Sequence, residues 1–257
     1  MNLSVPTTFP QDTFQEFGKL ASKLFLSVLS DENLDDPFQK QQHFERAWLA
    51  VHYRYRACSE QNEAFKVLFA KATDLWCEWG ADEEQNYRLE QCLYHFFMNC
   101  LSVFDSLAFC LYFVGAMIDP KHFDHVSNPK NITLKNTTRA FAAAFPNAAI
   151  TDHLRELSKD PEFKRIDTIR NILAHRLTGR RNVHSYGTTD SDGTYRQTKK
   201  EIWYIPGSNE ELEFGEKLIQ RHFEEATRLL TTLVSASLEF VKPKKKGISW
   251  RPVTSIE

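Results

Sequence analysis

Between Pro37 and Trp79 this 257-residue chain contains neither a glycine nor a further proline. These two residue types interrupt helices more than any others, so their absence over such a length predicts one long helix. Apolar residues recur through the stretch at helical spacing: Phe44, Trp48, Val51, Tyr55, Phe65, Leu68, Phe69, Leu75 and Trp76. A fold that accommodates this segment must be built from long helices packed side by side.

Two neighbouring segments show the same pattern. The spacing of apolar residues predicts a helix over 11–29, followed by a polar break at 30–33. Gly80 is typical of a position just after a helix ends. The acidic residues 82–84 are typical of a first helical turn, so the next helix is expected over 83–118, ending before Asp119-Pro120. We therefore expect an all-α, up-and-down bundle of long antiparallel helices.

The middle of the chain is predicted to be less regular. Residues 119–150 are irregular and then rich in alanine and phenylalanine. Two shorter helices are expected near 148–158 and 161–177, the second beginning with Asp160-Pro161-Glu162, a typical helix start.

The last part of the chain changes character before one more helix. Residues 178–207 predict a loop or β-hairpin insertion that turns at Asp192-Gly193. The final helix is expected to run from about residue 208 to residue 241. We expect a single helical domain over 10–241 and a basic C-terminal tail over 242–257.

The segment 96–118 holds a single charged residue, Asp105, and is long enough to span a bilayer. Asn99, Ser102 and Asp105 would be costly in lipid, and the same helix continues upstream into a strongly charged stretch. A fully enclosed helix of a soluble bundle has the same composition. We therefore expect a core helix and no membrane association.

Composition indicates a cytoplasmic protein without a cofactor. Five cysteines at irregular spacing indicate reduced, buried thiols, and residues 1–9 show no secretory pattern. Phosphate-binding loops, metalloprotease motifs and serine-hydrolase motifs are missing. His122 and His125 flank Asp124, but without a third ligand nearby a polar loop is favoured over a metal site.

One stretch has the residues of a catalytic motif: Asp167-Thr-Ile-Arg170-Asn171-Ile-Leu-Ala-His175-Arg176. Arginine followed by histidine after four to six residues is expected about 1.6 times by chance in this composition, and three pairs occur. When asparagine must follow the arginine and histidine must stand four residues further on, the expected number falls to about one in forty. Only Arg170 and His175 satisfy this stricter pattern.

This stretch resembles the signature of the HEPN superfamily, whose active members are metal-independent ribonucleases. A long aromatic-rich helix with Asp105 in its middle resembles the Cthe-type branch of that family. The resemblance implies Arg170, Asn171 and His175 as catalytic residues, with Asp105 and Asp167 beside them. It also implies a homodimer, in which two copies bring an arginine edge and an Asn/His edge into one groove.

Helix geometry and side-chain chemistry agree with that role. At about 100° per residue, Phe163, Ile166, Leu173 and Leu177 form an apolar stripe with Arg170 at its edge. His175 could deprotonate a ribose 2′-hydroxyl or protonate the leaving 5′-oxygen, because the ordinary histidine pKa is about 6.5. Arg170 could bind the phosphate, leaving 2′,3′-cyclic phosphate ends.

Positive charge surrounds the motif, with nine Lys or Arg against three Asp over residues 164–200. Such a concentration favours binding of a phosphate backbone, and exposed tyrosines stack on unpaired bases. The predicted RNA-binding residues are Arg176, Arg180, Arg181, Tyr186, Tyr195, Lys199 and Lys200.

The same residues also fit roles that are not catalytic. Arg170 and His175 could form an ion network at a helix end, with Arg170 paired to Asp167, and Asp105 could be a buried hydrogen-bonded acid. The runner-up function is a non-catalytic HEPN module that binds RNA, a nucleotide or a partner protein. The family resemblance implies a toxin or phage-defence effector with an antitoxin or regulatory partner. Some family members are silenced by modification of a tyrosine at the position of Leu177, so that form of control is not expected here.

Overall fold

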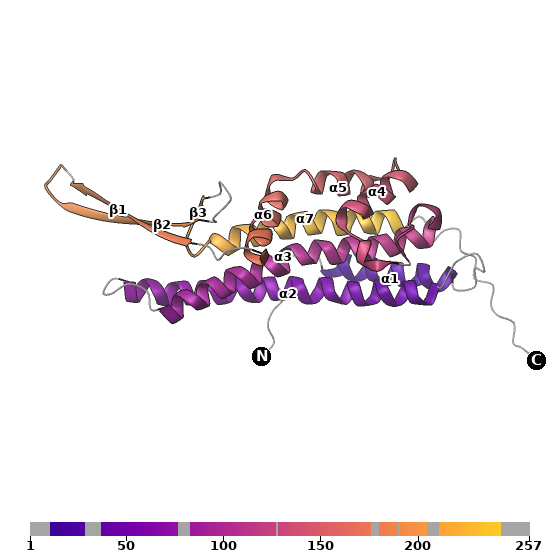
Figure 1. Ribbon diagram of the computed structural model, residues 1–257, viewed down its shortest axis with the longest axis horizontal. Coiled ribbons are helices and arrows are strands. Elements are labelled where there is room, and N and C mark those ends of the chain that lie inside the picture. The colour runs from indigo at the N-terminus through magenta and orange to yellow at the C-terminus, as the bar shows by residue number, and fades with distance from the viewer. Residues whose placement is uncertain are drawn as a thin grey trace, which may run out of the picture. The chain divides into compact units, whose positions relative to one another are not determined.

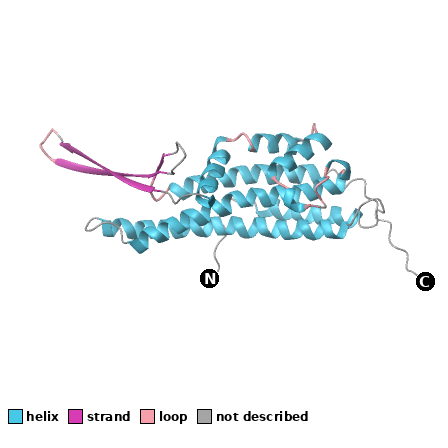
Figure 2. Ribbon diagram, in the orientation of Figure 1, coloured by secondary structure: helices cyan, strands magenta, loops and turns pink. Residues whose placement is uncertain are grey.

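The computed structural model describes residues 11–28, 37–76, 83–126, 128–175, 180–189, 191–204 and 211–242. These residues are mostly helical, with one small antiparallel sheet, which confirms the all-α class (Figures 1 and 2). The arrangement that is specific to HEPN proteins stays a prediction.

Three long helices occupy the first half of the chain where the sequence predicts them. They are α1 (Gln11–Val28), α2 (Pro37–Trp76) and α3 (Glu83–Ile118). Each described boundary falls within a few residues of its predicted position.

A helix between residues 134 and 144 corrects the expectation of an irregular segment. Two 3₁₀ helices, η1 (Pro120–His122) and η2 (Pro129–Asn131), precede this helix, α4 (Leu134–Ala144). The hydroxyl of Thr133 accepts a hydrogen bond from the backbone N–H of Asn136 and caps α4 at its start. The predicted helices near 148–158 and 161–177 are α5 (Ala149–Leu157) and α6 (Pro161–His175).

The predicted hairpin is confirmed, and the predicted start of the last helix is wrong. Strand β1 (Arg180–Thr189) pairs with β2 (Tyr195–Tyr204), and Gly193 between them has a φ of 83°, which a glycine adopts without strain. A third strand, β3 (Glu211–Glu213), pairs with β2 where helix was expected. The last helix, α7 (Leu218–Val241), therefore begins ten residues later than predicted.

The chain clusters into two compact units, and the single domain expected over 10–241 stays a prediction. Unit 1 contains residues 1–52, 103–159 and 227–257, and unit 2 contains residues 53–102 and 160–226. Helices α2, α3 and α7 contribute residues to both units.

Aromatic side chains form the core of unit 1. Phe14 of α1 stacks on Trp48 of α2, with ring centroids 3.7 Å apart. Phe141 of α4 contacts Phe240 of α7 at 5.5 Å. A hydrogen bond also joins α4 to α3: the hydroxyl of Thr137 donates to the backbone carbonyl oxygen of Ala108. The core of unit 1 is thus held by aromatic packing between helices distant in sequence.

Unit 2 is centred on Trp203 of β2, which is fully buried. Its ring stacks on Phe97 of α3, and its indole N–H donates to a carboxylate oxygen of Glu90 at 3.1 Å. Tyr55 of α2 contacts Phe223 of α7 with ring centroids 5.4 Å apart. The base of the hairpin is thus anchored to α3, whereas its tip extends away from the helices of the same unit (Figure 1).

Among the described residues, α3 is the helix that is long and apolar enough to cross a membrane. Its most apolar window has a mean hydropathy of 1.9, yet 78% of that window is buried inside the structure. This burial is consistent with the expected core helix of a soluble protein. The cysteines behave as expected where they are described: Cys58, Cys92, Cys100 and Cys110 are free and buried, and Cys77 lies outside the described residues.

Candidate functional site

Helix α6 carries the motif, and Asp160 defines where this helix begins. The Asp160 carboxylate accepts hydrogen bonds from the backbone N–H groups of Glu162 and Phe163, at 2.9 and 3.1 Å. These donors have no partner within the helix, so the side chain caps it, while Pro161 occupies a position where no N–H is needed. The start signal read from the sequence is confirmed.

The buried face of α6 is wider than the predicted apolar stripe. Phe163 and Ile166 are buried as expected, but Ile169 and Ile172 are buried as well. Leu173 is only half-buried, and Leu177 lies outside the described residues. Arg170 is half-buried, and its angle around the helix axis lies between those of Phe163 and Ile166. Its side chain therefore starts from an otherwise apolar face of α6.

Asn171 connects the two charged residues of the motif. Its amide oxygen accepts a hydrogen bond from Nη1 of Arg170 at 2.7 Å. Its amide nitrogen donates to a carboxylate oxygen of Asp167 at 3.0 Å. All three side chains are half-buried. The polar chain Asp167–Asn171–Arg170 therefore fixes both ends of the amide and orients the guanidinium.

This geometry differs from a direct ion pair between Arg170 and Asp167. Arg170 and Asp167 are each bonded to the Asn171 amide, which lies between them. His175 is the last residue of α6, four residues after Asn171, and its side chain lies outside the described residues. Residues four apart lie on the same side of a helix, so the backbone places Asn171 and His175 on one flank.

Asp105 belongs to unit 1, whereas Arg170 belongs to unit 2. Its side chain is exposed, so it is not the buried acid of the alternative interpretation. Its predicted role beside Arg170 stays a prediction.

Most of the predicted RNA-binding residues lie on the hairpin. In the backbone register Arg180 and Arg181 pair with Tyr204 and Trp203, Tyr186 pairs with Thr198, and Lys199 and Lys200 pair with Ser185 and His184. The side chains of these five predicted residues, and Arg176 as a whole, lie outside the described residues.

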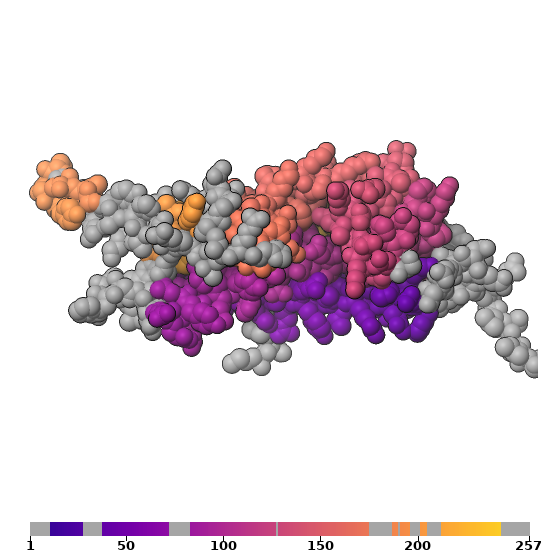
Figure 3. All heavy atoms as spheres, in the orientation of Figure 1, coloured from indigo at the N-terminus to yellow at the C-terminus, as the bar shows by residue number. Residues whose placement is uncertain are grey.

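Tyr195 is the predicted stacking residue whose side chain is described, and it is 66% exposed. Its ring lies over Gly187 of the neighbouring strand, so closely that a Cβ on this glycine would meet the tyrosine ring. The described tip of the hairpin, residues 187–189 and 191–195, is exposed throughout (orange, far left in Figure 3). A flat aromatic ring is thus presented near the tip, as base stacking requires.

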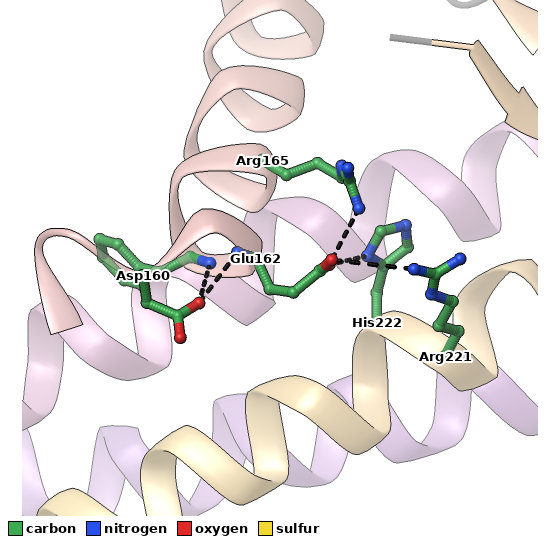
Figure 4. A network of polar contacts seen from close by, with 6 residues as sticks. Asp160, Glu162, Arg165, Arg221 and His222 are labelled. Atoms are coloured by element: carbon green, nitrogen blue, oxygen red, sulfur yellow. Dashed lines mark hydrogen bonds and ion pairs between the residues drawn. The ribbon is translucent and has the colours of Figure 1, made fainter. Parts of the chain in front are cut away.

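A second polar cluster lies at the start of α6, where the sequence predicted only a helix start. Glu162 accepts a hydrogen bond from Nη1 of Arg165 at 2.7 Å (Figure 4). The same carboxylate lies 3.7 Å from Nδ1 of His222 and 3.9 Å from Nη2 of Arg221, both on α7. The pairing of Glu162 with Arg165 has a local signal, since the two are three residues apart. His222 is sixty residues away in the chain, so no local sequence pattern predicts its contact with Glu162.

The surroundings of His222 shift its pKa strongly. Its side chain is 2% exposed, and Phe97 covers the ring edge-on with centroids 5.4 Å apart. Burial, and then the charges of Arg165 and Arg221, lower the pKa of His222 to about 4. At neutral pH the imidazole is therefore uncharged.

Metal binding finds little support among the side chains described. No group of three or more His, Cys, Asp or Glu residues in that part of the chain is arranged to hold an ion. Nδ1 of His122 lies 3.0 Å from the Asp119 carboxylate, and Nδ1 of His125 lies 3.7 Å from that of Asp124. Each of these histidines thus faces a neighbouring carboxylate.

Comparison of the chain with family models, with curated proteins and with solved structures found no match. The interpretation of the site therefore depends on the residues of α6 and on their geometry.

Proposed function

We propose that this protein is a metal-independent endoribonuclease of the HEPN type, with Arg170, Asn171 and His175 as its catalytic residues. The observation that supports this most directly is the hydrogen-bonded chain Asp167–Asn171–Arg170 near the end of α6. A polar residue directly after the arginine is part of the motif, and here that residue holds the guanidinium.

Arg170 binds the scissile phosphate and stabilises the charge on its oxygens in the transition state. A guanidinium has five N–H donors in a planar fork, and the bond to Asn171 occupies one of them. Because Asp167 holds the far end of the Asn171 amide, the guanidinium loses little orientational freedom on binding phosphate. Asn171 and Asp167 act here by positioning Arg170.

His175 is the acid–base catalyst in this proposal. Its imidazole takes the proton from the ribose 2′-hydroxyl, whose oxygen attacks the phosphorus, and the bond to the 5′-oxygen breaks as this oxygen receives the proton from the imidazolium. The products carry a 2′,3′-cyclic phosphate and a 5′-hydroxyl. DNA has no 2′-hydroxyl and is not cleaved.

The substrate is RNA, held by the basic segment over 164–200 and by stacking on Tyr195. The proposed active form is a cytoplasmic homodimer, as the family resemblance implies. The biological role we propose is that of a toxin or phage-defence effector, controlled by an antitoxin or regulatory partner.

The test is cleavage of mixed RNA in EDTA by the wild type and by His175→Ala. Wild type should produce fragments with 2′,3′-cyclic phosphate ends, and His175→Ala should lose at least about a hundredfold in rate. His153→Ala, a histidine on α5 in unit 1, is the matched control and should keep full activity.

The outcomes separate the proposal from its runner-up. Full activity of His175→Ala would overturn the catalytic assignment. Saturable RNA binding by the wild type without cleavage, in EDTA and in magnesium alike, would favour the non-catalytic module. Sedimentation velocity on the same samples tests the homodimer.

A further inference from the structure

Unit 1 contains a pocket of about 420 Å³ between the α4–α5 connection and the last turns of α7. Its walls are mostly apolar and include Phe145, Ile150, Ala236 and Phe240, while Asn147 and Glu239 supply polar groups. A volume of this size, with apolar walls and few polar groups, is typical of small-molecule sites.

The apolar wall is aromatic. The rings of Phe145 and Phe240 lie 5.0 Å apart between centroids at an angle of 64°, and Phe141 contacts both of them. Aromatic faces carry partial negative charge, so they attract organic cations as well as apolar groups.

The polar end of the pocket carries a carboxylate, that of Glu239. Glu239 accepts a hydrogen bond from Nζ of Lys242 at 2.8 Å, and both side chains are exposed to solvent. The hydrogen bond to Glu239, and the charges of Glu239 and Glu16, raise the pKa of Lys242. The Glu239 carboxylate therefore lies where a cation is already bound, and the C-terminal end of α7 adds the negative end of a helix dipole.

We propose that this pocket binds an organic ammonium ion with an apolar body. The apolar body would fill the space between Phe145, Ala236 and Phe240, and the cationic group would lie against the aromatic faces and the Glu239 carboxylate. Lys242 already places an ammonium on this carboxylate, so it is an internal competitor for the ligand. The site belongs to unit 1, and the proposal is independent of the ribonuclease proposal.

The probe is benzyltrimethylammonium, titrated into the full-length protein and followed by amide chemical shifts in NMR spectra. Benzylsulfonate, at matched ionic strength, is the anionic control of the same size. We expect saturable shifts at residues 145–150 and 236–240 with the cation, and none with the sulfonate.

Three variants distinguish the proposed site from weak surface adsorption. Glu239→Gln should weaken binding of the cation by about threefold or more, whereas Lys242→Ala should strengthen it by about twofold or more, because the competitor is removed. Ala236→Phe should abolish binding by filling the space. Glu45→Gln, on α2, which does not line the pocket, should change nothing.

The proposal is overturned if the two probes bind equally, if no saturable shift occurs, or if Glu239→Gln and Lys242→Ala leave the affinity unchanged. Both substitutions are at exposed positions, so this comparison holds even if Ala236→Phe does not fold.

Discussion

Nη1 of Arg170 donates a hydrogen bond to the side-chain oxygen of Asn171 at 2.7 Å, although the two residues are neighbours in sequence. Adjacent residues of a helix point about 100° apart, so this contact requires the long arginine side chain to bend around the helix toward Asn171. Asp167, one turn earlier, holds the other end of the asparagine amide. The arrangement gives the motif a defined geometry within a single helix.

Replacing Asn171 with Ala should lower the rate of RNA cleavage by up to about a hundredfold, the effect of misplacing a catalytic group by about 1 Å. Asp167→Asn should have a smaller effect, because an amide oxygen still accepts the hydrogen bond from Asn171. Single-turnover cleavage measures both. Thr168→Ala, exposed on the same helix, is the control, and an equal loss in this variant would contradict a specific role for Asn171.

His222 should make the protein less stable as the pH falls from about 6.5 to about 4. The pKa of His222 is about 4 in the folded protein and near 6.5 when exposed, so the unfolded chain binds more protons across this window. The free energy of unfolding therefore decreases as the pH decreases. Each pKa unit corresponds to about 1.4 kcal/mol, so the full loss is about 3 kcal/mol.

Urea denaturation at a series of pH values tests this expectation. His222→Leu should remove this part of the pH dependence while the carboxylates continue to titrate in both proteins. If the wild type and His222→Leu lose stability in parallel from pH 7 to pH 4, His222 does not have the proposed lowered pKa.

Asp160→Ala should destabilise the protein by about 1 kcal/mol, because two backbone N–H groups at the start of α6 lose their acceptor. Asp160→Asn should stay within about 0.5 kcal/mol of the wild type, since asparagine caps helices as well as aspartate does. Thermal and urea unfolding measure both variants. A loss in Asp160→Asn as large as that in Asp160→Ala would show that charge, and not the cap, is the source of the stabilisation.

Gly115→Ala should destabilise unit 1 even though alanine is the better helix former. A Cβ at Gly115 would lie less than 3 Å from the ring of Phe123, which is buried. Overpacking of this kind costs about 1–3 kcal/mol, more than the roughly 1 kcal/mol that alanine contributes over glycine in a helix. Gly215→Ala is the control, because nothing lies within 4 Å of its Cβ position, and it should be close to neutral.

The predicted helices that proved right are those with strong local signals. Asp160-Pro161 begins α6, and the polar or glycine-containing breaks separate α1, α2 and α3 as expected. The turn at Asp192-Gly193 is also local, because its geometry depends on the positive φ of one glycine.

The predictions that failed depend on contacts between distant segments. Strand β3 has three residues, too few for an alternating pattern, and it is defined by its pairing with β2. Without that partner, its residues resemble the start of the following helix. Helix α4 was missed because its hydrophobic face is completed by residues such as Phe240, about a hundred positions later in the chain.

The candidate site divides in the same way. The sequence by itself determined that Asn171 and His175 share one flank of α6, because a helical repeat of 3.6 residues brings positions four apart together. The side-chain geometry within α6 shows that Asn171 bridges Asp167 to Arg170. Only the tertiary structure decided that Glu162 meets His222, sixty residues later. Local periodicity sets the direction of each side chain, whereas its partners and its pKa depend on which distant residues exclude water around it.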